Sequence, residues 1–565
     1  MQVIIDKKKI EAKKNETILA VAQRVGIDIP YLSFNPELRG KGGDRVALVE
    51  VKGESKLMSA ETTKVREGMI IFTNSSKVQR FRRLNLELIF ASHIEKCADC
   101  TLRFNCRLLE LARLQQIKIS EFSDRKALRK TYRFSTAVEI DGTQCIDCGN
   151  CIEACALQGI NFLQFTGKGY QQELKPTNDK SRVCIHCGQC TNVCPVAAAQ
   201  EQLEWPQVEK VLADKTKIVV AQFAPAARVS IGEEFGMKQG TDCTKKINTA
   251  LKELGFAYSF DINFGADITT MIEAEELLQR LKNKKNLPLF TSCCPAWVTY
   301  AESYYPELLP HLTTARSPHI HSAGAIKTYF AKKKGLDRRQ IKVVSIVPCT
   351  AKKQEAVRTE LYYQKEPLVD YVLTVREFAF MLKKRQIDLA RLKESETEPL
   401  FNDGSGAAAI YGASGGVMES ALRTALFLNS TKEKKISNDF RLDFKELRLN
   451  KNIKEAEIML GKRKLRLAVI NGIANFHYIL PHLNKYHYIE VMACPGGCLG
   501  GGGQPLPNTK EIKEARRKAL YQIDKDKKIR RAHENKAMLT YYNWVKTNKL
   551  EAKLLHTKYF SRKRT

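Results

Sequence analysis

Residues 145–155 read CIDCGNCIEAC, and residues 184–195 read CIHCGQCTNVCP. Each run separates four cysteines by two, two and three residues, so the second run duplicates the first. Three thiolates on one tight loop can bind three corners of a [4Fe–4S] cube, while the fourth cysteine crosses to a second cube. Zinc ribbons or disulfides would not explain two copies of this four-cysteine run. The duplicated runs therefore predict two [4Fe–4S] clusters.

The same spacing predicts which cysteines share a cluster, because it is the spacing of the bacterial two-cluster ferredoxins. One cluster takes the first three cysteines of the first run and the last cysteine of the second run, and the other cluster takes the reverse. The first set is Cys145, Cys148, Cys151 and Cys194, and the second set is Cys184, Cys187, Cys190 and Cys155.

A third group of metal-binding side chains lies ahead of these runs. His93, Cys97, Cys100 and Cys106 fall within one short segment, which is enough to close a metal site. Zinc is the alternative for such a segment taken alone. Because the segment directly precedes the duplicated runs, we interpret it as a third [4Fe–4S] cluster with one histidine ligand. Histidine in place of a thiolate removes negative charge and tends to raise the reduction potential.

The composition is that of a globular protein that binds metal through cysteine. Of 565 residues, 43% are hydrophobic and 27% are charged, and the 17 cysteines cluster at metal-ligand spacings. The first residues, MQVIID, lack the apolar core of a signal peptide. The longest apolar stretch, around 218–227, is shorter than the about 20 residues that span a bilayer. We therefore expect no membrane span and a reducing, cytoplasmic compartment.

The net charge is +31, from 93 Lys and Arg against 62 Asp and Glu. Such a surplus occurs in proteins that bind nucleic acid, anionic membranes or acidic proteins. Here the basic residues are spread along the whole chain, and a basic proteome or solvated helix faces would explain them equally well. We expect no nucleic-acid partner.

The hydrophobic pattern of the first third predicts a small β-rich module followed by helices. Residues 2–12 alternate as in a hairpin, and a short helix follows over about 17–25. Strands are predicted near 46–51 and 68–71. Helical segments with basic faces cover about 75–120.

The pattern changes after about residue 206. Strands such as 218–221 and 343–347 alternate with helical stretches, which indicates an α/β arrangement. The Lys/Arg-rich end, about 511–565, is predicted to form helices and strap-like segments.

Three further segments lie in this second part. Residues 291–297 read TSCCPAW, residues 348–355 read PCTAKKQE, and residues 490–505 read EVMACPGGCLGGGGQP. In this order they resemble the signature segments of the [FeFe] hydrogenases, in their long, clostridial-type modular form. The resemblance extends over essentially the whole chain, to LLHTKY at residues 554–559. Two cysteines separated by Pro-Gly-Gly also suit a tight metal-binding turn, and the glycine run lets backbone approach a bulky cofactor closely.

The resemblance implies an H-cluster, in which a [4Fe–4S] cube is bridged to a two-iron subsite that carries CO, cyanide and an azadithiolate. It implies that Cys294, Cys349, Cys494 and Cys498 hold the cube and that Cys498 is the bridge. Lys352 is the expected hydrogen-bond donor to a cyanide, since an ammonium offers three donors, and a surface ion pair with Glu355 is the alternative. The other expected cofactor-binding residues are Ala224, Pro225, Ser317, Pro318, Val347, Pro348, Glu355, Gly412 and Met492.

The resemblance also implies a proton relay. Glu273, Glu276 and Arg280 stand at i, i+3 and i+7, so one helix face can carry all three. Cys293 is adjacent to a ligand but is not needed for the cube, and in the family this position passes protons. The expected path runs from Cys293 through a water, Glu273 and Thr313 to Glu276 near the surface and to Arg280. For the glutamates alone, a solvated helix face is the alternative.

The N-terminal module departs from the family pattern. It resembles the plant-type ferredoxin domain whose four cysteines hold [2Fe–2S], but the matching positions are Ser33, Asp44, Ala47 and Glu61. Oxygen ligands are a poor substitute for four thiolates. We therefore expect the fold without a [2Fe–2S] cluster. Departures near the active site, which we expect to alter the rate, are Ala226, His319, Val347 and Tyr411, and Cys243 has no expected role.

The expected architecture is multidomain α/β and α+β. The parts are a β-grasp-like, plant-type ferredoxin-like domain (1–78), a [4Fe–4S] segment with one histidine and three cysteine ligands (79–125), a two-[4Fe–4S] ferredoxin-like domain (126–205), a large α/β catalytic domain (206–510) and a C-terminal small-subunit-like segment (511–565). The expected cofactors are three accessory [4Fe–4S] clusters and the H-cluster.

The expected reaction is 2H+ + 2e− ⇌ H2. Ferredoxin or a similar small electron carrier is the expected partner, because a basic surface attracts acidic ferredoxins, and maturation proteins would build the H-cluster. Two alternatives stay open: an H2 sensor tuned for slow turnover, and a non-catalytic hydrogenase-like factor of iron–sulfur cluster assembly. The latter needs neither the relay nor Lys352, so the enzyme is favoured. A hydrogenosome-like organelle is the alternative compartment.

Overall fold

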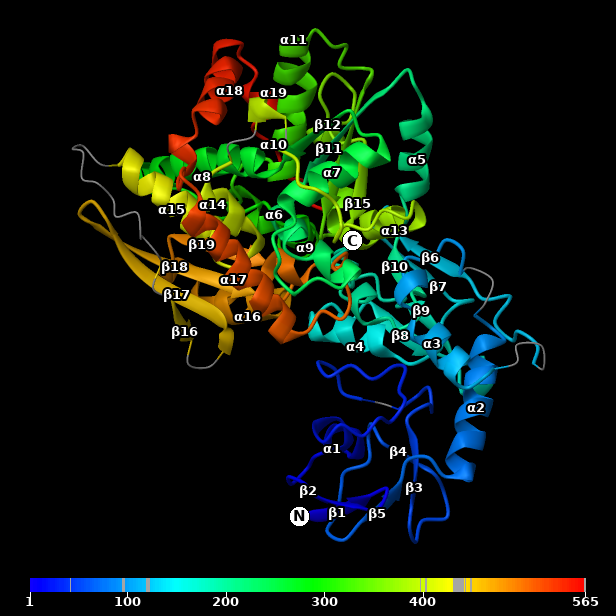
Figure 1. Ribbon diagram of the computed structural model, residues 1–565. Coiled ribbons are helices and arrows are strands. Elements are labelled where there is room, and N and C mark those ends of the chain that lie inside the picture. Colours follow the sequence, from blue (N-terminus) through cyan, green and yellow to red (C-terminus); the bar gives the residue numbers. More distant parts are fainter. Residues whose placement is uncertain are drawn as a thin grey trace.

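A small N-terminal module projects from a large body that carries the rest of the chain (Figure 1). The computed structural model describes residues 1–40, 42–93, 97–117, 122–396, 398–401, 404–429, 442, 444–447 and 450–562.

The N-terminal module is built on one five-stranded sheet of order β2-β1-β5-β3-β4. Its first strand pairs antiparallel with β2 and parallel with β5. Helix α1 begins after Thr17, whose side chain accepts a hydrogen bond from the Ala20 N–H. The hairpin and the short helix predicted from the sequence are confirmed. The bounds are β1 Gln2–Ile5, β2 Lys8–Glu11, α1 Ile18–Arg24, β3 Leu48–Val51, β4 Met58–Ser59 and β5 Ile70–Phe72.

Helix α2 (Ser76–Phe90) connects the module to the body (Figure 1). Arg82 is buried and donates hydrogen bonds to the carbonyls of Val46, Leu48 and Thr73, which fastens the helix to the module. The helical prediction over 75–120 is confirmed for α2 and for α3 (Arg107–Leu114).

The duplicated cysteine runs lie in a small domain made of a three-stranded sheet, β10-β7-β6, and the hairpin β8-β9. Arg376 of the neighbouring catalytic domain reaches into it and pairs with the buried Glu201 at 2.6 Å. The same guanidinium donates to the Thr191 hydroxyl at 3.1 Å. The bounds are β6 Thr131–Phe134, β7 Val138–Asp141, α4 Asn150–Leu157, β8 Leu163–Thr166, β9 Glu173–Pro176 and β10 Ala199–Glu201.

The catalytic part contains two sheets, and its strands and helices alternate as predicted for α/β. The first sheet is parallel, in the order β12-β11-β14-β15. The second has the order β13-β19-β18-β17-β16. In it β19 is parallel to both neighbours, β13 and β18, whereas β17 is antiparallel to both β18 and β16. The strand bounds are β11 Ile218–Phe223, β12 Tyr258–Asp261, β13 Leu289–Phe290, β14 Ile341–Val347, β15 Tyr371–Thr374, β16 Lys445–Leu447, β17 Asn450–Leu460, β18 Arg463–Asn471 and β19 Tyr488–Met492.

Helices pack around both sheets, and the 21-residue α8 (Asn263–Asn283) runs through the middle of the catalytic part (Figure 1). Its first half is buried on all sides. The remaining helices are α5 Trp205–Ala213, α6 Pro225–Arg228, α7 Thr244–Leu254, α9 Pro295–Tyr304, α10 Pro318–Ala325, α11 Ala331–Lys334, α12 Ala351–Ala356, α13 Val375–Lys384, α14 Gly406–Ala409, α15 Gly416–Leu428 and α16 Phe476–Ile479.

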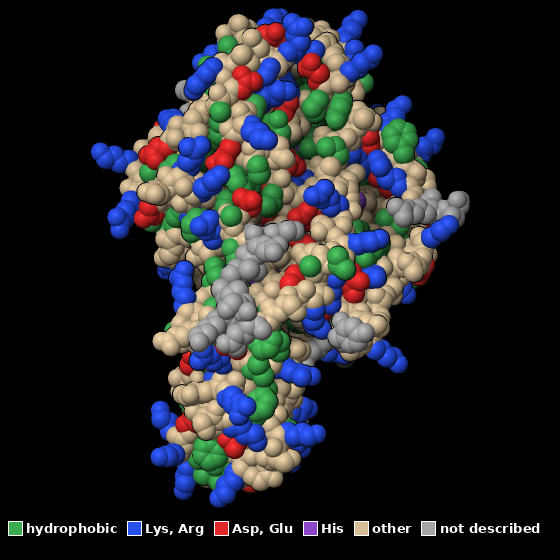
Figure 2. All heavy atoms as spheres, turned by 90° about the vertical axis from the view of Figure 1, so that its right-hand side faces the viewer, with side chains coloured by type: hydrophobic (Ala, Val, Ile, Leu, Met, Phe, Trp, Pro, Cys, Tyr) green, Lys and Arg blue, Asp and Glu red, His purple; other side chains and the backbone are tan. Residues whose placement is uncertain are grey.

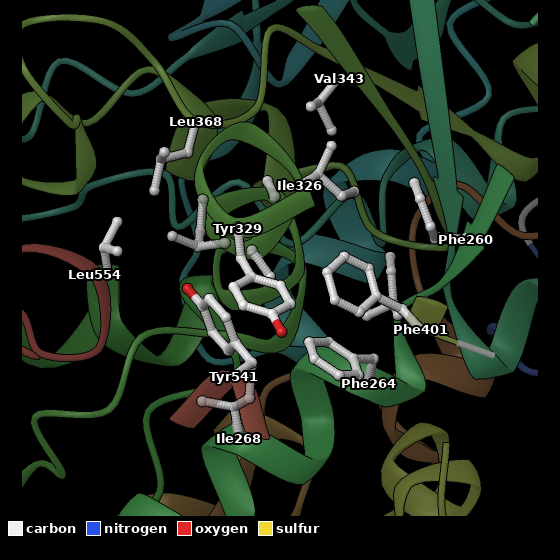
Figure 3. Packing of buried hydrophobic residues seen from close by; sticks show 14 of the residues in the cluster. Phe260, Phe264, Ile268, Ile326, Tyr329, Val343, Leu368, Phe401, Tyr541 and Leu554 are labelled. Carbon is white, nitrogen blue, oxygen red and sulfur yellow. The ribbon is translucent and has the colours of Figure 1, made fainter. Parts of the chain in front are cut away.

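Aromatic side chains fix the start of α8 in the largest hydrophobic core (Figure 3). The ring centroids of Phe264 and Phe401 lie 4.3 Å apart, and those of Phe260 and Phe401 lie 5.3 Å apart. The rings of Tyr329 and Tyr541 belong to the same cluster, and their centroids lie 5.8 Å apart. Because Tyr541 belongs to the C-terminal segment, that segment is part of the core.

The C-terminal segment forms α17 (Lys510–Asp526), α18 (Lys536–Thr547) and α19 (Glu551–Leu554) and then an extended strap, as predicted. The strap runs beside residues 314–316: the Arg316 N–H donates to the Leu555 carbonyl, and the Thr557 N–H donates to the Thr314 carbonyl.

The surface carries mixed charge. Lysine and arginine side chains are scattered over the whole face seen in Figure 2, with acidic side chains among them. Among the described residues, no helix combines the length and the apolar character needed to cross a bilayer.

Candidate metal centres and active site

The duplicated runs bring their eight cysteines into two groups. Burial raises the pKa of Cys151 well above its usual value, and neighbouring thiols raise it further. The same holds for Cys190. The neighbours of Cys151 are first Cys145, Cys148 and Cys194, and those of Cys190 are first Cys187, Cys184 and Cys155. Each group therefore joins three cysteines of one run to one cysteine of the other, in the combination that the spacing predicts.

The segment ahead of the runs forms a third group. Burial raises the pKa of Cys100 to about 12, and the charges of Cys106 and Cys97 add to this. His93 is buried, and its Nδ1 lies 2.9 Å from the carbonyl oxygen of Gln144. A backbone carbonyl at Nδ1 fixes the tautomer and leaves Nε2 as the ligand atom. The structure thus brings the three cysteines together and presents one ring nitrogen of His93.

A fourth group joins the three segments of the second part of the chain. Burial raises the pKa of Cys494 well above its usual value, and Cys349, Cys294 and Cys498 are among its neighbouring thiols. All four thiols lie in the interior. The structure therefore brings together every cysteine that the resemblance assigns to the H-cluster cube.

The four groups form a chain across the molecule. Cys194, which belongs to the group of Cys145, is a neighbour of Cys100 in the group of His93. At the other end, Cys187 is a neighbour of Cys349, and the Cys494 Sγ lies 3.8 Å from the Cys187 carbonyl oxygen. The order is therefore the His93 group, the Cys145 group, the Cys184 group and the Cys494 group.

Glycines let the loops of the last two groups interlock. A Cβ on Gly188 would stand 2.4 Å from the Thr350 Oγ1 and 2.9 Å from the Gly502 Cα. A Cβ on Gly501 would stand 2.2 Å from the Pro348 carbonyl oxygen. These clashes explain why the run after Cys498 is glycine: it packs backbone against backbone, whereas the sequence had indicated close approach to a cofactor.

The thiols are not gathered around single metal ions. In the described part of the chain, no group of three or more His, Cys, Asp or Glu side chains closes around a single metal ion. A zinc ion would hold every thiolate about 2.3 Å from one point, whereas a cube binds each thiolate through a different iron.

A cavity of about 60 Å³ opens beside Cys349 and Cys498. Its wall is mostly apolar, with Cys293, His319, Lys352 and Tyr411 as the other side chains that carry a polar group. Six residues that the resemblance assigns to cofactor binding line it: Ala224, Pro225, Pro318, Val347, Pro348 and Gly412. The sequence reasoning missed Ile262 and Ala266, and it named Ala226, His319 and Tyr411 only as departures, although all five line the cavity.

Lys352 is held in place by buried partners. Its Nζ donates to the Glu355 Oε2 at 2.7 Å and to the Cys293 carbonyl at 3.1 Å. Burial would lower the pKa of Lys352, but the Glu355 carboxylate outweighs it and the pKa is raised. Glu355 also accepts from the Ser317 hydroxyl at 2.9 Å, and the His319 Nε2 lies 2.7 Å from it. Ser317 and Glu355 therefore stand behind the cavity wall and orient the ammonium.

His319 is neutral in this network. Burial and the Lys352 charge lower its pKa to about 4, in spite of the bond to Glu355. Met492 packs with Cys293 and Tyr411 in a small apolar cluster at the cavity edge.

Cys293 faces the cavity, and Glu273 stands behind it. Burial raises the pKa of Cys293 well above its usual value, and Glu273 is the nearest charge. Glu273 is fully buried, and its Oε2 accepts a hydrogen bond from the Tyr488 hydroxyl at 2.7 Å. Its Oε1 is buried without a hydrogen-bond partner among the described residues. Burial raises the pKa of Glu273 to about 8, so the group holds a proton at neutral pH.

Glu276 accepts hydrogen bonds from Thr314, whereas the sequence had indicated Thr313 as its neighbour in the relay. The Thr314 N–H lies 3.1 Å from both carboxylate oxygens, and the Thr314 hydroxyl also donates to Oε1. The Thr313 hydroxyl instead accepts from the Ala315 N–H at 3.2 Å. A role for Thr313 between the two glutamates stays a prediction, and sequence reasoning missed Thr314. The hydroxyl-rich pair 313–314 was the only signal for it.

The positions of the absent [2Fe–2S] ligands are buried in the N-terminal module. The Asp44 carboxylate accepts from the N–H groups of Ser33 at 2.6 Å and Val46 at 2.8 Å. Burial and the Asp44 charge raise the pKa of Glu61 to about 7. The Ser33 carbonyl accepts from the Asn150 side chain at 2.7 Å, which docks this loop onto the first cysteine run. Ala47 packs in the module's hydrophobic core.

Four family models match the chain in series. The large catalytic part, residues 217–502, matches the iron only hydrogenase large subunit, C-terminal domain. Residues 144–198 match a 4Fe-4S dicluster domain, residues 510–562 the iron hydrogenase small subunit, and residues 1–76 a 2Fe-2S iron-sulfur cluster binding domain. The last match runs against the expectation of no [2Fe–2S] cluster, although residues 1–78 contain no cysteine.

Relatives match the chain from end to end. The NADP-reducing hydrogenase subunit HndD of Solidesulfovibrio fructosivorans is 36% identical over 100% of this chain and 99% of its own length. Iron hydrogenase 1 of Clostridium pasteurianum is 39% identical over 96% of each chain. A cytosolic Fe-S cluster assembly factor of Danio rerio is more distant, at 29% identity over 63% of this chain and 90% of its own length.

A solved structure supports the same assignment. The apo [FeFe]-hydrogenase HydA1 from Chlamydomonas reinhardtii, a variant form, is 35% identical with a TM-score of 0.56, over 63% of this chain and 99% of its own. The matches to the large-subunit domain, the dicluster domain and the small subunit thus follow one another in one chain. This chain belongs to the family of iron-only hydrogenases, oxidoreductases that act on H2.

Proposed function

We propose that this protein catalyses 2H+ + 2e− ⇌ H2 at an H-cluster held by Cys294, Cys349, Cys494 and Cys498. The observation that carries the proposal is the cavity beside Cys498, which is apolar except for Cys293, His319, Lys352, Tyr411 and the proposed ligand thiols. When bound, the H-cluster supplies the redox chemistry that joins two protons to two electrons. Cys498 borders the cavity and is the proposed bridge to the two-iron subsite.

The cavity residues would hold the anionic ligands of that subsite. The Lys352 ammonium uses two of its donors on Glu355 and the Cys293 carbonyl, which leaves one donor for a cyanide. The apolar wall excludes water, so this charge-assisted bond is strong. The ion pair between Lys352 and Glu355, which was the alternative interpretation of this motif, is also present. It orients the Lys352 ammonium toward the cavity.

We propose Cys293 as the side chain that exchanges protons with the cofactor and Glu273 as the next proton store. Both groups hold their protons at neutral pH, because burial raises the pKa of each. The unpartnered Oε1 of Glu273 provides an acceptor for a bridging water, which is the role that the expected path gives to water. Glu276 continues the path toward the surface.

Three accessory [4Fe–4S] clusters form the proposed electron path. Their ligands are the His93, Cys145 and Cys184 groups, in the spatial order found above. Neighbouring groups adjoin through Cys100 and Cys194, through Cys194 and Cys190, and through Cys187 and Cys349. The Cys187 loop, interlocked with the glycines after Cys498, would place the Cys184 cluster beside the H-cluster.

A small acidic electron carrier such as ferredoxin is the proposed partner. Helix α2 ends just before His93 and exposes three apolar side chains on one face, with exposed fractions of 44% for Phe81, 38% for Leu84 and 47% for Leu88. Arg80 and Arg83 lie on the same helix. An exposed apolar stripe beside basic side chains suits a transient electron-transfer complex with an acidic protein.

We propose that the β-grasp-like N-terminal module holds no [2Fe–2S] cluster in spite of its family match. Its four ligand positions carry no thiol, and Asp44 is already bound to the module's own backbone. The module instead packs against the Cys145 loop through Ser33 and Asn150. Its role would be to cover that cluster.

The test is anaerobic maturation of the full chain, followed by infrared spectroscopy for CO and cyanide bands and by an H2 assay with a reduced low-potential donor. We expect both the bands and turnover. Bands without turnover in either direction would favour an H2 sensor. Absence of the bands after maturation that succeeds on a control hydrogenase would favour an assembly factor.

All seventeen cysteines are free thiols in the structure, which suits a reducing compartment such as the cytoplasm.

A further inference from the structure

A histidine of the C-terminal strap stands at the outer end of the relay. The His556 Nδ1 lies 2.7 Å from the Thr314 Oγ1 and 3.9 Å from the Glu276 Oε1. Thr314 in turn donates its hydroxyl hydrogen to Glu276. The three side chains come from three separate parts of the chain, namely α8, the residues before α10, and the strap after α19.

The directions of these hydrogen bonds follow from the donors available. The single Thr314 hydroxyl hydrogen points at the Glu276 Oε1, which accepts it. The Thr314 oxygen must then accept from His556, which places a hydrogen on Nδ1 and leaves Nε2 as the free acceptor. The result is a continuous row of hydrogen bonds, His556 Nδ1–H to Thr314 O–H to Glu276, along which a proton can pass from His556 to Glu276.

Exposure separates His556 from the other candidates for the outer position. The His556 side chain is 39% exposed, whereas that of Glu276 is 14% exposed and that of Arg280 is 13% exposed. A guanidinium does not release its proton in proteins, so Arg280 cannot pass one. Its Nη1 and Nη2 instead donate to the backbone carbonyls of Asn286, Pro310, His311 and Leu312, which makes it a brace for this corner.

We propose that His556 exchanges protons with solvent and passes them through the Thr314 hydroxyl to Glu276. In the direction of H2 formation, Nε2 binds a proton from solvent and Nδ1 gives its proton to the Thr314 oxygen. The Thr314 hydroxyl hydrogen moves to the Glu276 carboxylate. Each hop breaks one N–H or O–H bond and forms another, and no electron moves. The reverse sequence serves H2 oxidation.

Burial lowers the pKa of His556 below its usual value, which favours the neutral ring that the hydrogen-bonded row requires. The carboxylates of Glu276, Glu275 and Glu551 oppose this effect, and Arg316 adds to it. The proposal rests on the relay described above, since a proton delivered to Glu276 is useful only if the inner path exists.

The experiment compares the matured full-length wild type with His556→Gln, Thr314→Val and Cys293→Ala. His556→Gln removes the titrating ring, and Thr314→Val removes the hydroxyl but keeps the backbone N–H on Glu276. We expect H2 evolution to fall at least about 10-fold in both, less than the 10²–10⁴ of a proton donor at the reacting atom, because water partly replaces an exposed group. Added imidazole should restore His556→Gln but not Thr314→Val.

Further variants separate chemistry from structure. Thr314→Ser keeps the hydroxyl and should retain near-wild-type activity, and His477→Gln, which removes an exposed histidine outside the relay, should change nothing. The infrared bands should be the same in all variants. Wild-type turnover with a loss in Cys293→Ala but none in His556→Gln would overturn this proposal and leave the proposed function standing. A loss in His556→Gln that imidazole does not restore would assign His556 a structural role and also overturn it. An inactive wild type would instead defeat the proposed function.

Discussion

Replacing Tyr488 by phenylalanine tests whether Glu273 stores a relay proton. The Tyr488 hydroxyl is 2.7 Å from the Glu273 Oε2, and it is the group that chiefly opposes the effect of burial on the Glu273 pKa, which stands at about 8. A hydrogen bond to a charged group contributes about 1.5–3 kcal/mol, and one pKa unit corresponds to about 1.4 kcal/mol. Losing the hydroxyl should therefore raise the Glu273 pKa by about 1–2 units.

The sign of the effect differs between the two directions of turnover. H2 evolution needs protonated Glu273 as a donor, so evolution should decline as pH rises through about 8 in the wild type. H2 oxidation needs the carboxylate as an acceptor, so oxidation should rise over the same range. In Tyr488→Phe both inflections should move upward by about 1–2 units. At neutral pH, oxidation should then fall by about 10- to 100-fold while evolution is maintained.

The assay is the pH dependence of both activities with artificial dyes, which bypass any protein partner. Tyr542→Phe is the matched control, because the Tyr542 hydroxyl donates to Glu275 at 2.8 Å on the same helix but outside the relay. Its inflections should remain where they are. An unchanged oxidation profile in Tyr488→Phe would refute the assignment of Glu273 as the titrating group.

Four further predictions follow from the same contacts. Cys293→Ala should keep the infrared bands and lower turnover by about 10² or more, whereas Cys243→Ala, which removes a buried thiol without a site role, should do neither. Arg376→Ala leaves the buried Glu201 unpaired and should destabilise the protein by about 3–5 kcal/mol in chemical unfolding, against almost no effect for the exposed Arg391→Ala. The full-length protein should show no reduced [2Fe–2S] EPR signal, and a stoichiometric signal would contradict the proposal for the N-terminal module. The KM for an acidic ferredoxin should rise with salt while the KM for a viologen dye does not, and equal salt dependence would argue against the proposed partner.

The grouping of the cysteines that we propose as metal ligands could be predicted because cysteine spacing records the geometry of a loop. Two thiols separated by two residues can face one cube, and the crossing of Cys155 and Cys194 between the runs follows from the spacing alone. The α/β character of the catalytic part was equally readable, since buried parallel strands such as β11 are continuous apolar runs.

Other features depend on contacts between distant segments and leave no local signal. The cavity wall includes Ile262 and Ala266, ordinary apolar residues whose position only the fold reveals. Thr313 and Thr314 are adjacent and chemically equal, so nothing in the sequence says which hydroxyl faces Glu276. The structure gives that contact to Thr314, because the strap turns the backbone of residues 314–316 toward α8.

Protons and electrons reach the proposed active site through different parts of the chain. The electron side is held by interlocked glycine backbones, Gly188 against Gly502, which bring the Cys187 loop onto the loop after Cys498. The proton side is held by the strap, because the Tyr559 hydroxyl donates to the Thr313 carbonyl and the Arg316 side chain donates to the His556 carbonyl.

This division explains why a segment that contributes no metal ligand is built into the core. The strap fixes residues 313–316 beside Glu276, and through His556 it supplies a titratable side chain that is more exposed than Glu276. A strap placed one residue out of register would turn the His556 side chain away from Thr314, since neighbouring residues of an extended strand face opposite sides. The iron sites would be unchanged by such a shift. In the proposed paths, proton delivery through His556 therefore depends on the register of residues 555–557, and electron delivery through the cysteine groups does not.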